Sequence, residues 1–119
     1  MEKVNIQEKF SQFTERWQPK IIGEVNDFYV KAGRLLGEFV WHSHENEDEM
    51  FLVIEGVLTI KFRDRDVELH PGEFLVVPKG VEHLPLAKEE VKVIMFEPKS
   101  TLNTGNVQNE RTVADLERL

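Results

Sequence analysis

Three histidines and one glutamate in the middle of the chain have the spacing expected of a metal site. His42 and His44 lie two positions apart, so on a β-strand both side chains point to the same face and can reach one ion. Glu49 opens the next apolar run, and a hairpin between the two segments would bring its carboxylate beside the imidazoles. Two histidines and a carboxylate form the ligand set of open iron and related sites. We expect His83, which follows the turn at residues 78–80, to supply a fourth ligand.

The same residues fall into two motifs that resemble those of the cupin superfamily. In the first, a His-x-His pair is followed after three or four residues by Glu and after six more by Gly, here His42, His44, Glu49 and Gly56. The second has Gly, five residues, Pro-x-Gly, two residues and His, here Gly72, Pro78, Gly80 and His83. The resemblance covers about residues 37–87. It implies a small antiparallel barrel of jelly-roll type, with both histidine clusters facing its interior.

Two positions depart from the pattern of the family. The glycine that opens the first motif is expected at Leu36 and stands at Gly37, and the asparagine that often closes the second is replaced by Ala87. Neither position supplies a metal ligand in the family. The departures therefore concern the shape of the loops and of the pocket.

These ligands imply one divalent transition metal as the cofactor. The chain has no Cys, so any metal must bind to imidazole and carboxylate groups. Fe, Mn, Ni, Zn, Co and Cu all suit such ligands, and the sequence does not select among them. An ion held by three neutral imidazoles and one carboxylate keeps a positive charge and open positions, so it can act as a Lewis acid or lower the pKa of bound water. With iron, oxygen chemistry is added.

The elements that must position these ligands are predicted to be mostly β-strands. A chain of 119 residues is one domain by length, with the barrel core at about 21–97. In this core, apolar residues recur with period two in short runs divided by turn residues, which indicates an all-β sandwich or barrel. The clearest runs are residues 28–30, 37–41, 50–54, 57–62, 74–77 and 91–96, with turns at 55–56, 63–66 and 71–72.

Two short helices are predicted outside the barrel. Apolar residues recur every three to four positions from Ile6 to Trp17, which predicts a short N-terminal helix at about residues 5–17. Residues 98–119 are predicted to form a polar arm and then a short C-terminal helix that starts near Thr112.

Charge and hydropathy limit the partners. Asp and Glu number 22 against 15 Lys and Arg, a formal charge of -7, which argues against nucleic acid and anionic membranes. The charged N-terminal residues lack the apolar core of a signal peptide and no apolar run could span a bilayer, so we expect a soluble cytoplasmic protein. The resemblance to small cupins implies paired barrels. Since edge strands and apolar terminal segments need cover, we expect a homodimer whose interface uses the N-terminal helix or the arm.

Other polar and aromatic residues have more than one interpretation. Glu45, Glu47 and Asp48 are predicted to form a solvated loop face, the alternative being groups behind the ligands or facing a substrate. His70 lies outside both motifs and is predicted to be a surface residue. Five aromatic residues at strand period are predicted to be core, with pocket lining as the alternative: Phe39, Trp41, Phe51, Phe74 and Phe96.

We consider three functions. The first is a metalloenzyme, such as a dioxygenase, isomerase or lyase, that acts on a small, polar, oxygen-rich molecule; it rests on the resemblance and on the chemistry of the ligands. The second is a non-catalytic module that binds a small ligand with or without metal. The third is a small barrel whose main use is to dimerise. Turnover that disappears in a His44→Ala variant would separate the first from the other two.

Overall fold

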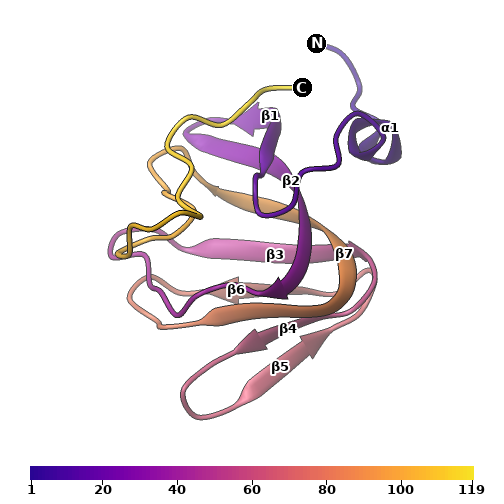
Figure 1. The fold of residues 1–119 in the computed structure, drawn as a ribbon. Coiled ribbons are helices and arrows are strands. Elements are labelled where there is room, and N and C mark those ends of the chain that lie inside the picture. Colours follow the sequence, from indigo (N-terminus) through magenta and orange to yellow (C-terminus); the bar gives the residue numbers. More distant parts are fainter.

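All residues, 1–119, are described by the computed structural model, in which seven strands form one antiparallel sheet that curls around an interior (Figure 1). Along the sheet the strands follow the order β1-β2-β7-β3-β6, and β4 pairs with both β5 and β7. The elements are α1 (Ile6–Phe10), β1 (Lys20–Val25), β2 (Phe28–Glu38), β3 (Glu49–Glu55), β4 (Leu58–Lys61), β5 (Asp66–Leu69), β6 (Phe74–Val77) and β7 (Leu84–Pro98). The predicted all-β antiparallel fold is confirmed.

β7 joins the two halves of the sheet. Its C-terminal half lies between β2 and β3, and Val93 pairs with Gly33 on one side and with Val53 on the other. Its N-terminal end pairs instead with β4, where Pro85 lies opposite Ile60. Because β7 changes partners along its length, the sheet bends, and the strand curves visibly in Figure 1.

Both faces of β7 are buried, each in its own core. Val91, Val93 and Met95 belong to the main core of 11 buried residues inside the cup. Ile94 points to the opposite face and packs with Phe10 from the N-terminal segment. Successive side chains of a strand alternate between faces, so this double burial explains why the segment is almost continuously apolar.

The N-terminal helix is shorter than predicted. α1 ends at Phe10 instead of continuing to about residue 17. In a longer helix, the carbonyl groups of Phe10 and Phe13 would accept hydrogen bonds from the backbone of the next turn. Here they accept from the guanidinium of Arg34 on β2 instead, at 2.7 Å for Phe10 O and 3.0 Å for Phe13 O. Trp17 has a left-handed backbone with φ of 61°, which ends any helix there. The apolar spacing still marks burial, because Phe10 and Phe13 both pack against the sheet.

The predicted C-terminal helix is absent, so that part of the prediction is wrong. No helix follows β7. The side chains of Thr112 and Asn103 accept backbone N–H groups of this segment, which favours turns over a helix. The last residues then run beside β1, where Leu119 N donates to Ile21 O at 3.0 Å. The end of the chain thus covers the edge of β1.

The boundaries of β2 depart from the prediction near the first motif. The predicted strand at residues 37–41 is wrong beyond Glu38, where β2 ends and the chain leaves the sheet. The register between β2 and β7 shifts between Leu35 and Gly37, and Gly37 takes a φ of 81° that favours glycine. The displaced glycine of the first motif therefore lies at an irregularity that redirects the chain toward the histidines.

Two strands were not among the predicted runs. Only half of the residues in β1 and in β5 are apolar, and β5 begins at Asp66, the last residue of a predicted turn. The alternation of inward and outward side chains along these two strands becomes apparent only when the strands that pair with them are known.

Candidate metal centre

The backbone brings the two histidine motifs together. His42 and His83 form an isolated antiparallel bridge in which His42 N donates to His83 O at 3.1 Å and His83 N donates to His42 O at 2.9 Å. Glu49 is the first residue of β3. The ligand atoms of His42, His44, Glu49 and His83 all lie within 4.8 Å of one another, and all four residues are buried. The structure therefore assembles the four residues that the sequence singled out.

The Pro-x-Gly turn supports the second histidine of the first motif. Gly80 N donates to His44 O at 2.7 Å, and Gly80 has a φ of 81°, which favours glycine. Beside it, Lys79 N donates to Asp48 Oδ1 at 2.9 Å. Asp48 is therefore neither a ligand nor a free surface charge. It fixes this turn against the loop that carries His44.

Backbone carbonyls set the orientation of two imidazoles. His42 Nδ1 lies 2.9 Å from Val40 O, and His83 Nδ1 lies 3.0 Å from Val81 O. A carbonyl oxygen only accepts, so each Nδ1 carries a proton and donates it. This leaves Nε2 of both rings for a ligand at the centre of the cluster. Such carbonyl contacts are the usual support of metal-binding histidines.

The centre of the cluster holds acceptors that face one another. Glu49 Oε1 lies 3.2 Å from His83 Nε2 and 3.4 Å from His44 Nε2. Neither ring nitrogen of His44 has a hydrogen-bond partner, although both are buried. Facing acceptors require a cation between them, either a proton or a metal ion. Neighbouring ligand atoms around an ion with bonds of about 2 Å lie about 3–3.5 Å apart, so the side chains fit a bound metal.

A buried ion pair lies directly behind Glu49. Lys31 Nζ donates to Glu97 Oε1 at 2.6 Å, and both side chains are at most 2% exposed. Met50 pairs with Phe96 in the β3–β7 ladder, so Glu49 and Glu97 are adjacent across the two strands. The pair places a cationic group beside two neighbouring carboxyls.

The pKa values of Glu49 and Glu97 are shifted in opposite directions. Burial raises the pKa of Glu97 well above its usual range, and the neighbouring charge of Glu49 raises it further. Burial would also raise the pKa of Glu49, but the neighbouring side chains of Glu97, His44 and His83 lower it well below its usual value. Glu49 is therefore the more acidic of the two carboxyls and the one that can offer an ionised group to a metal ion.

His42 is neutral at neutral pH. Burial lowers its pKa to about 4, and the nearby His83 contributes in the same direction. A metal ion therefore does not compete with a proton for His42 over most of the physiological pH range.

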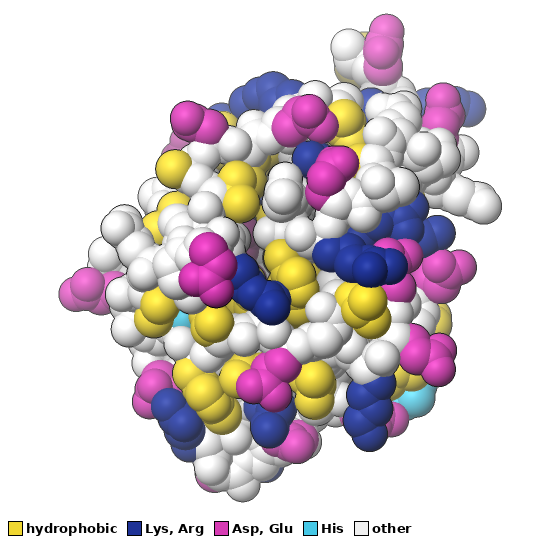
Figure 2. All heavy atoms as spheres, in the orientation of Figure 1, with side chains coloured by type: hydrophobic (Ala, Val, Ile, Leu, Met, Phe, Trp, Pro, Cys, Tyr) yellow, Lys and Arg dark blue, Asp and Glu magenta, His cyan; other side chains and the backbone are white.

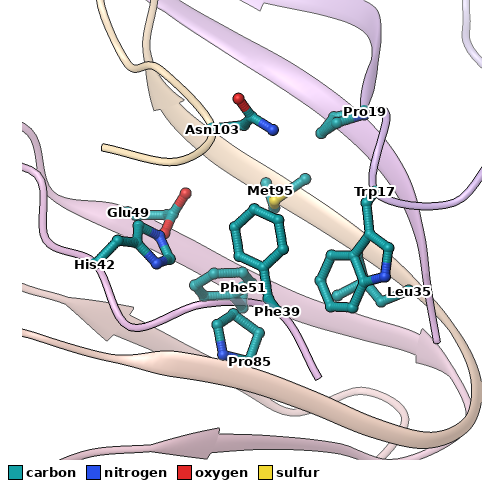
Figure 3. A pocket seen from close by; sticks show the side chains of 10 residues that line it. All are labelled: Trp17, Pro19, Leu35, Phe39, His42, Glu49, Phe51, Pro85, Met95 and Asn103. Atoms are coloured by element: carbon teal, nitrogen blue, oxygen red, sulfur yellow. The ribbon is translucent and has the colours of Figure 1, made fainter. Parts of the chain in front are cut away.

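A cavity opens on one side of the cluster. The centre of a water-sized molecule can occupy about 30 Å³ of it, within about 380 Å³ of space that includes open solvent, and His42 and Glu49 lie in its wall (Figure 3). The remaining wall is apolar except for Asn103. It consists of Trp17, Pro19, Leu35, Phe39, Phe51, Pro85 and Met95. A molecule in this cavity would contact two of the four ligand residues.

The other candidate residues have separate places. Glu45 is exposed, and Glu47 accepts a hydrogen bond from Ser100 at 2.8 Å. His70 is exposed and lies 2.8 Å from Glu68, which confirms it as a surface residue. Among the aromatic residues, Phe39 and Phe51 are buried in the core and also line the cavity, Trp41 stacks with Arg63, and Phe96 stacks with Phe28. Phe74 is 61% exposed, so its prediction as a core residue is wrong.

Sequence reasoning missed Lys31, Glu97 and the cavity residues Trp17 and Asn103. Strand parity could have revealed Glu97, which shares its face with Val93 and Met95 and therefore points inward. No sequence signal places Asn103 at the cavity, because that contact depends on how the chain returns after β7.

The sequence matches the family described as "Cupin domain" over residues 28–97. The uncharacterized protein YdbB of Bacillus subtilis is 38% identical over 79 residues, which are 66% of this chain and 64% of that protein. The acireductone dioxygenase of the same organism is 29% identical over 75 residues, or 59% of this chain and 42% of that enzyme. The matches thus span less than two thirds of either relative.

A solved structure shares the fold over most of the chain. The crystal structure of a cupin-2 domain containing protein from Shewanella frigidimarina superposes with a TM-score of 0.80 at 50% identity. The superposition covers 81% of this chain and 94% of that chain. No helix of the present structure is long and apolar enough to cross a membrane.

We predict that Lys31→Met lowers the free energy of unfolding by about 3 kcal/mol, because it leaves buried Glu97 without its partner. The double variant Lys31→Met, Glu97→Leu should recover at least half of that loss. Urea titrations measure both values. Lys99→Met, which breaks a more exposed pair with Glu24, serves as control and should leave stability nearly unchanged. A double variant that loses the sum of the two single losses would contradict a buried pair of this kind.

We also predict that the metal-free protein loses stability on acidification. The pKa of His42 is about 4 in the fold against 6.5 as its usual value, so the unfolded chain binds the proton more tightly. The contribution of neutral His42 to the free energy of unfolding is therefore complete above pH 6.5. It falls by roughly 3 kcal/mol as the pH drops to about 4. Urea titrations at several pH values in this range should show that the free energy of unfolding depends less steeply on pH in His42→Gln than in the wild type. Equal slopes in both proteins would refute the assignment to His42.

Proposed function

The chain belongs to the cupin family, and on that premise we propose that it binds one divalent transition metal ion through His42, His44, Glu49 and His83 and acts on a small molecule in the adjacent cavity. The observation that carries the proposal is the buried set of facing acceptors, two of whose residues border the cavity. A molecule held there would lie beside the open positions of the ion.

The residues of the chain would hold the ion and shield it from bulk water. The carbonyls of Val40 and Val81 keep two imidazoles in place, and Lys31 with Glu97 supports Glu49 from behind. When bound, the metal supplies Lewis acidity and, in the case of iron, reactivity toward oxygen. The apolar wall, with Phe39 and Phe51 among its members, excludes water from the bound molecule.

Among the enzyme classes considered, a dioxygenase agrees best with the cavity. Apart from Glu49 and His42, no titratable side chain borders it, so few groups are available for the acid-base steps of an isomerase or lyase. The likeness to the acireductone dioxygenase also supports this class. The same scarcity of acid-base groups favours the second candidate, a module that binds its ligand without turnover.

The first test is elemental analysis of the purified, untagged protein. We predict about one equivalent of a transition metal in the wild type and almost none in a folded His42→Ala, His44→Ala double variant, because two of the four ligands are gone. His70→Ala is the matched control, since this histidine is exposed and lies outside the cluster. A wild type that stays empty after incubation with Fe²⁺, Mn²⁺, Ni²⁺, Co²⁺, Cu²⁺ or Zn²⁺ would refute the metal site.

The second test separates an enzyme from a binding module. Iron-loaded protein is given pentane-2,4-dione, catechol or phenylpyruvate in an oxygen electrode. We predict oxygen consumption with at least one of them, lost in His44→Ala and kept in His70→Ala. Binding of these compounds without any turnover would favour the module instead.

We also propose a homodimer, formed through a different surface from the one expected. The arm and the end of the chain contact their own chain, through Ser43 and Ile21, and do not project from it. β6 is an edge strand of the sheet, and its residues Phe74 and Val76 are 61% and 47% exposed. Such an edge needs cover. A cytoplasmic location stays a prediction.

Light scattering after size exclusion tests the dimer. We predict a dimer for the wild type and a monomer for Phe74→Lys, because a charge on the edge opposes pairing. Val57→Lys is the control, an exposed apolar residue outside the strands. A wild type that is monomeric at all concentrations would contradict the proposal.

A further inference from the structure

One wall of the cavity is a stack of two aromatic rings. Trp17 and Phe39 lie 4.7 Å apart between ring centroids, with 13° between their planes. Phe39 also meets the imidazole of His42 edge-on, with 5.4 Å between the ring centroids. The stack therefore extends from the metal ligands toward the outer part of the cavity. A flat apolar body would find matching faces here.

Arg111 places a positive charge without an ion-pair partner beside two of the residues that line the cavity. Its guanidinium carbon lies 5.2 Å from the ring centroid of Trp17 and 5.8 Å from that of Phe39. One of its nitrogens, Nη1, is buried and has no hydrogen-bond partner. Four other arginines each pair with a glutamate, namely Arg16, Arg34, Arg63 and Arg118, whereas Arg111 and the exposed Arg65 pair with none. An unsatisfied buried donor is costly, and an anion at this place would remove the cost.

The backbone of Arg111 is fixed by neighbouring side chains. Its N–H donates to Asn109 Oδ1 at 2.8 Å, and its carbonyl accepts from Asn103 Nδ2 at 2.8 Å. Asn103 itself borders the cavity. The whole arm is anchored near the metal ligands, since Gly105 packs so closely on Ser43 O that a β-carbon would not fit. The backbone that carries the guanidinium is thus fixed in advance of any ligand.

Trp17 adopts a backbone conformation that is unfavourable for a bulky residue. A left-handed conformation is rare for a bulky residue and costs about 1–2 kcal/mol, yet Trp17 has a φ of 61°. Its N–H donates to Arg34 O at 2.9 Å and its indole Nε1 donates to Leu36 O at 2.8 Å. Strain that is maintained in this way commonly marks a residue of a binding site.

We propose that the ligand of this cavity is a small molecule with a flat apolar body and a carboxylate, and that Arg111 is the specificity-determining residue that pairs with the carboxylate. The inference rests on the proposed function for the role of the cavity, and it names the class of substrate. The apolar body lies along Trp17 and Phe39, and the end opposite the carboxylate lies toward His42 and Glu49. In Figure 2, hydrophobic side chains gather around a hollow near the centre of the face shown, and a basic side chain lies at its edge.

The test compares benzoate with benzamide, which share a flat ring and differ in charge. Calorimetric titration is carried out on the protein as purified and after loading with Zn²⁺, with the metal content measured in both samples. We predict that benzoate binds at least tenfold more tightly than benzamide in both samples. Equal affinities in the wild type would overturn the proposal, without the need for any variant.

Two variants assign the preference to Arg111. Arg111→Gln should lower the affinity for benzoate at least tenfold and leave that for benzamide nearly unchanged. Arg63→Gln is the matched control, since this arginine also stacks on a tryptophan, with 3.8 Å to the ring centroid of Trp41, but Trp41 does not line the cavity. A preference for benzoate that survives Arg111→Gln would overturn the role of Arg111.

The experiments can refute the proposed metal site and this inference independently of each other. Protein that binds metal but does not prefer benzoate overturns the inference and leaves the metal site intact. Protein that contains no metal and still prefers benzoate, through Arg111, supports the inference and refutes the metal site.

Discussion

The structure depends on one electrostatic constraint, which is that buried acceptors converge on a single point. Glu49 faces Nε2 of His44 and of His83, and no side-chain donor lies between them. The four residues are at most 3% exposed, so bulk solvent has little access to these groups. A cation must balance them, and a divalent metal satisfies all the acceptors at once. The fold around the cluster supplies what such an ion requires: fixed imidazoles, an ionised carboxylate and a dry surrounding.

The sheet is arranged so that strands far apart in sequence meet at this point. β7 carries Glu97 behind the cluster, pairs with both β2 and β3, and follows directly after His83. After β7 the chain returns and lays its arm against the loop of the first motif, where Asn106 Oδ1 accepts from Ser43 N at 2.9 Å. The arm thereby completes the cavity wall and brings Arg111 to the aromatic stack. The same segment therefore has a structural and a recognition role.

Much of this was predictable from the sequence, and the remainder has a physical explanation. The motif spacing predicted all four clustered residues, although His42 and His44 follow the end of β2 and do not lie on a strand as the parity argument assumed. The helices beyond residue 10 and near Thr112 were wrong, because carbonyl and N–H groups there bind Arg34, Asn103 and β1 instead of forming local turns. The cavity wall and the roles of Lys31 and Arg111 depend on contacts between distant segments. Such contacts leave no periodic signal in the sequence.

Anomalous diffraction from crystals grown with Co²⁺ tests the central claim most directly. The account predicts one strong peak among Nε2 of His42 and His83, the imidazole of His44 and the carboxylate of Glu49. Each ligand atom should lie about 2 Å from the peak. A peak only at the exposed pair of His70 and Glu68, or no peak at all, would contradict the claim that this cluster exists to bind a metal ion.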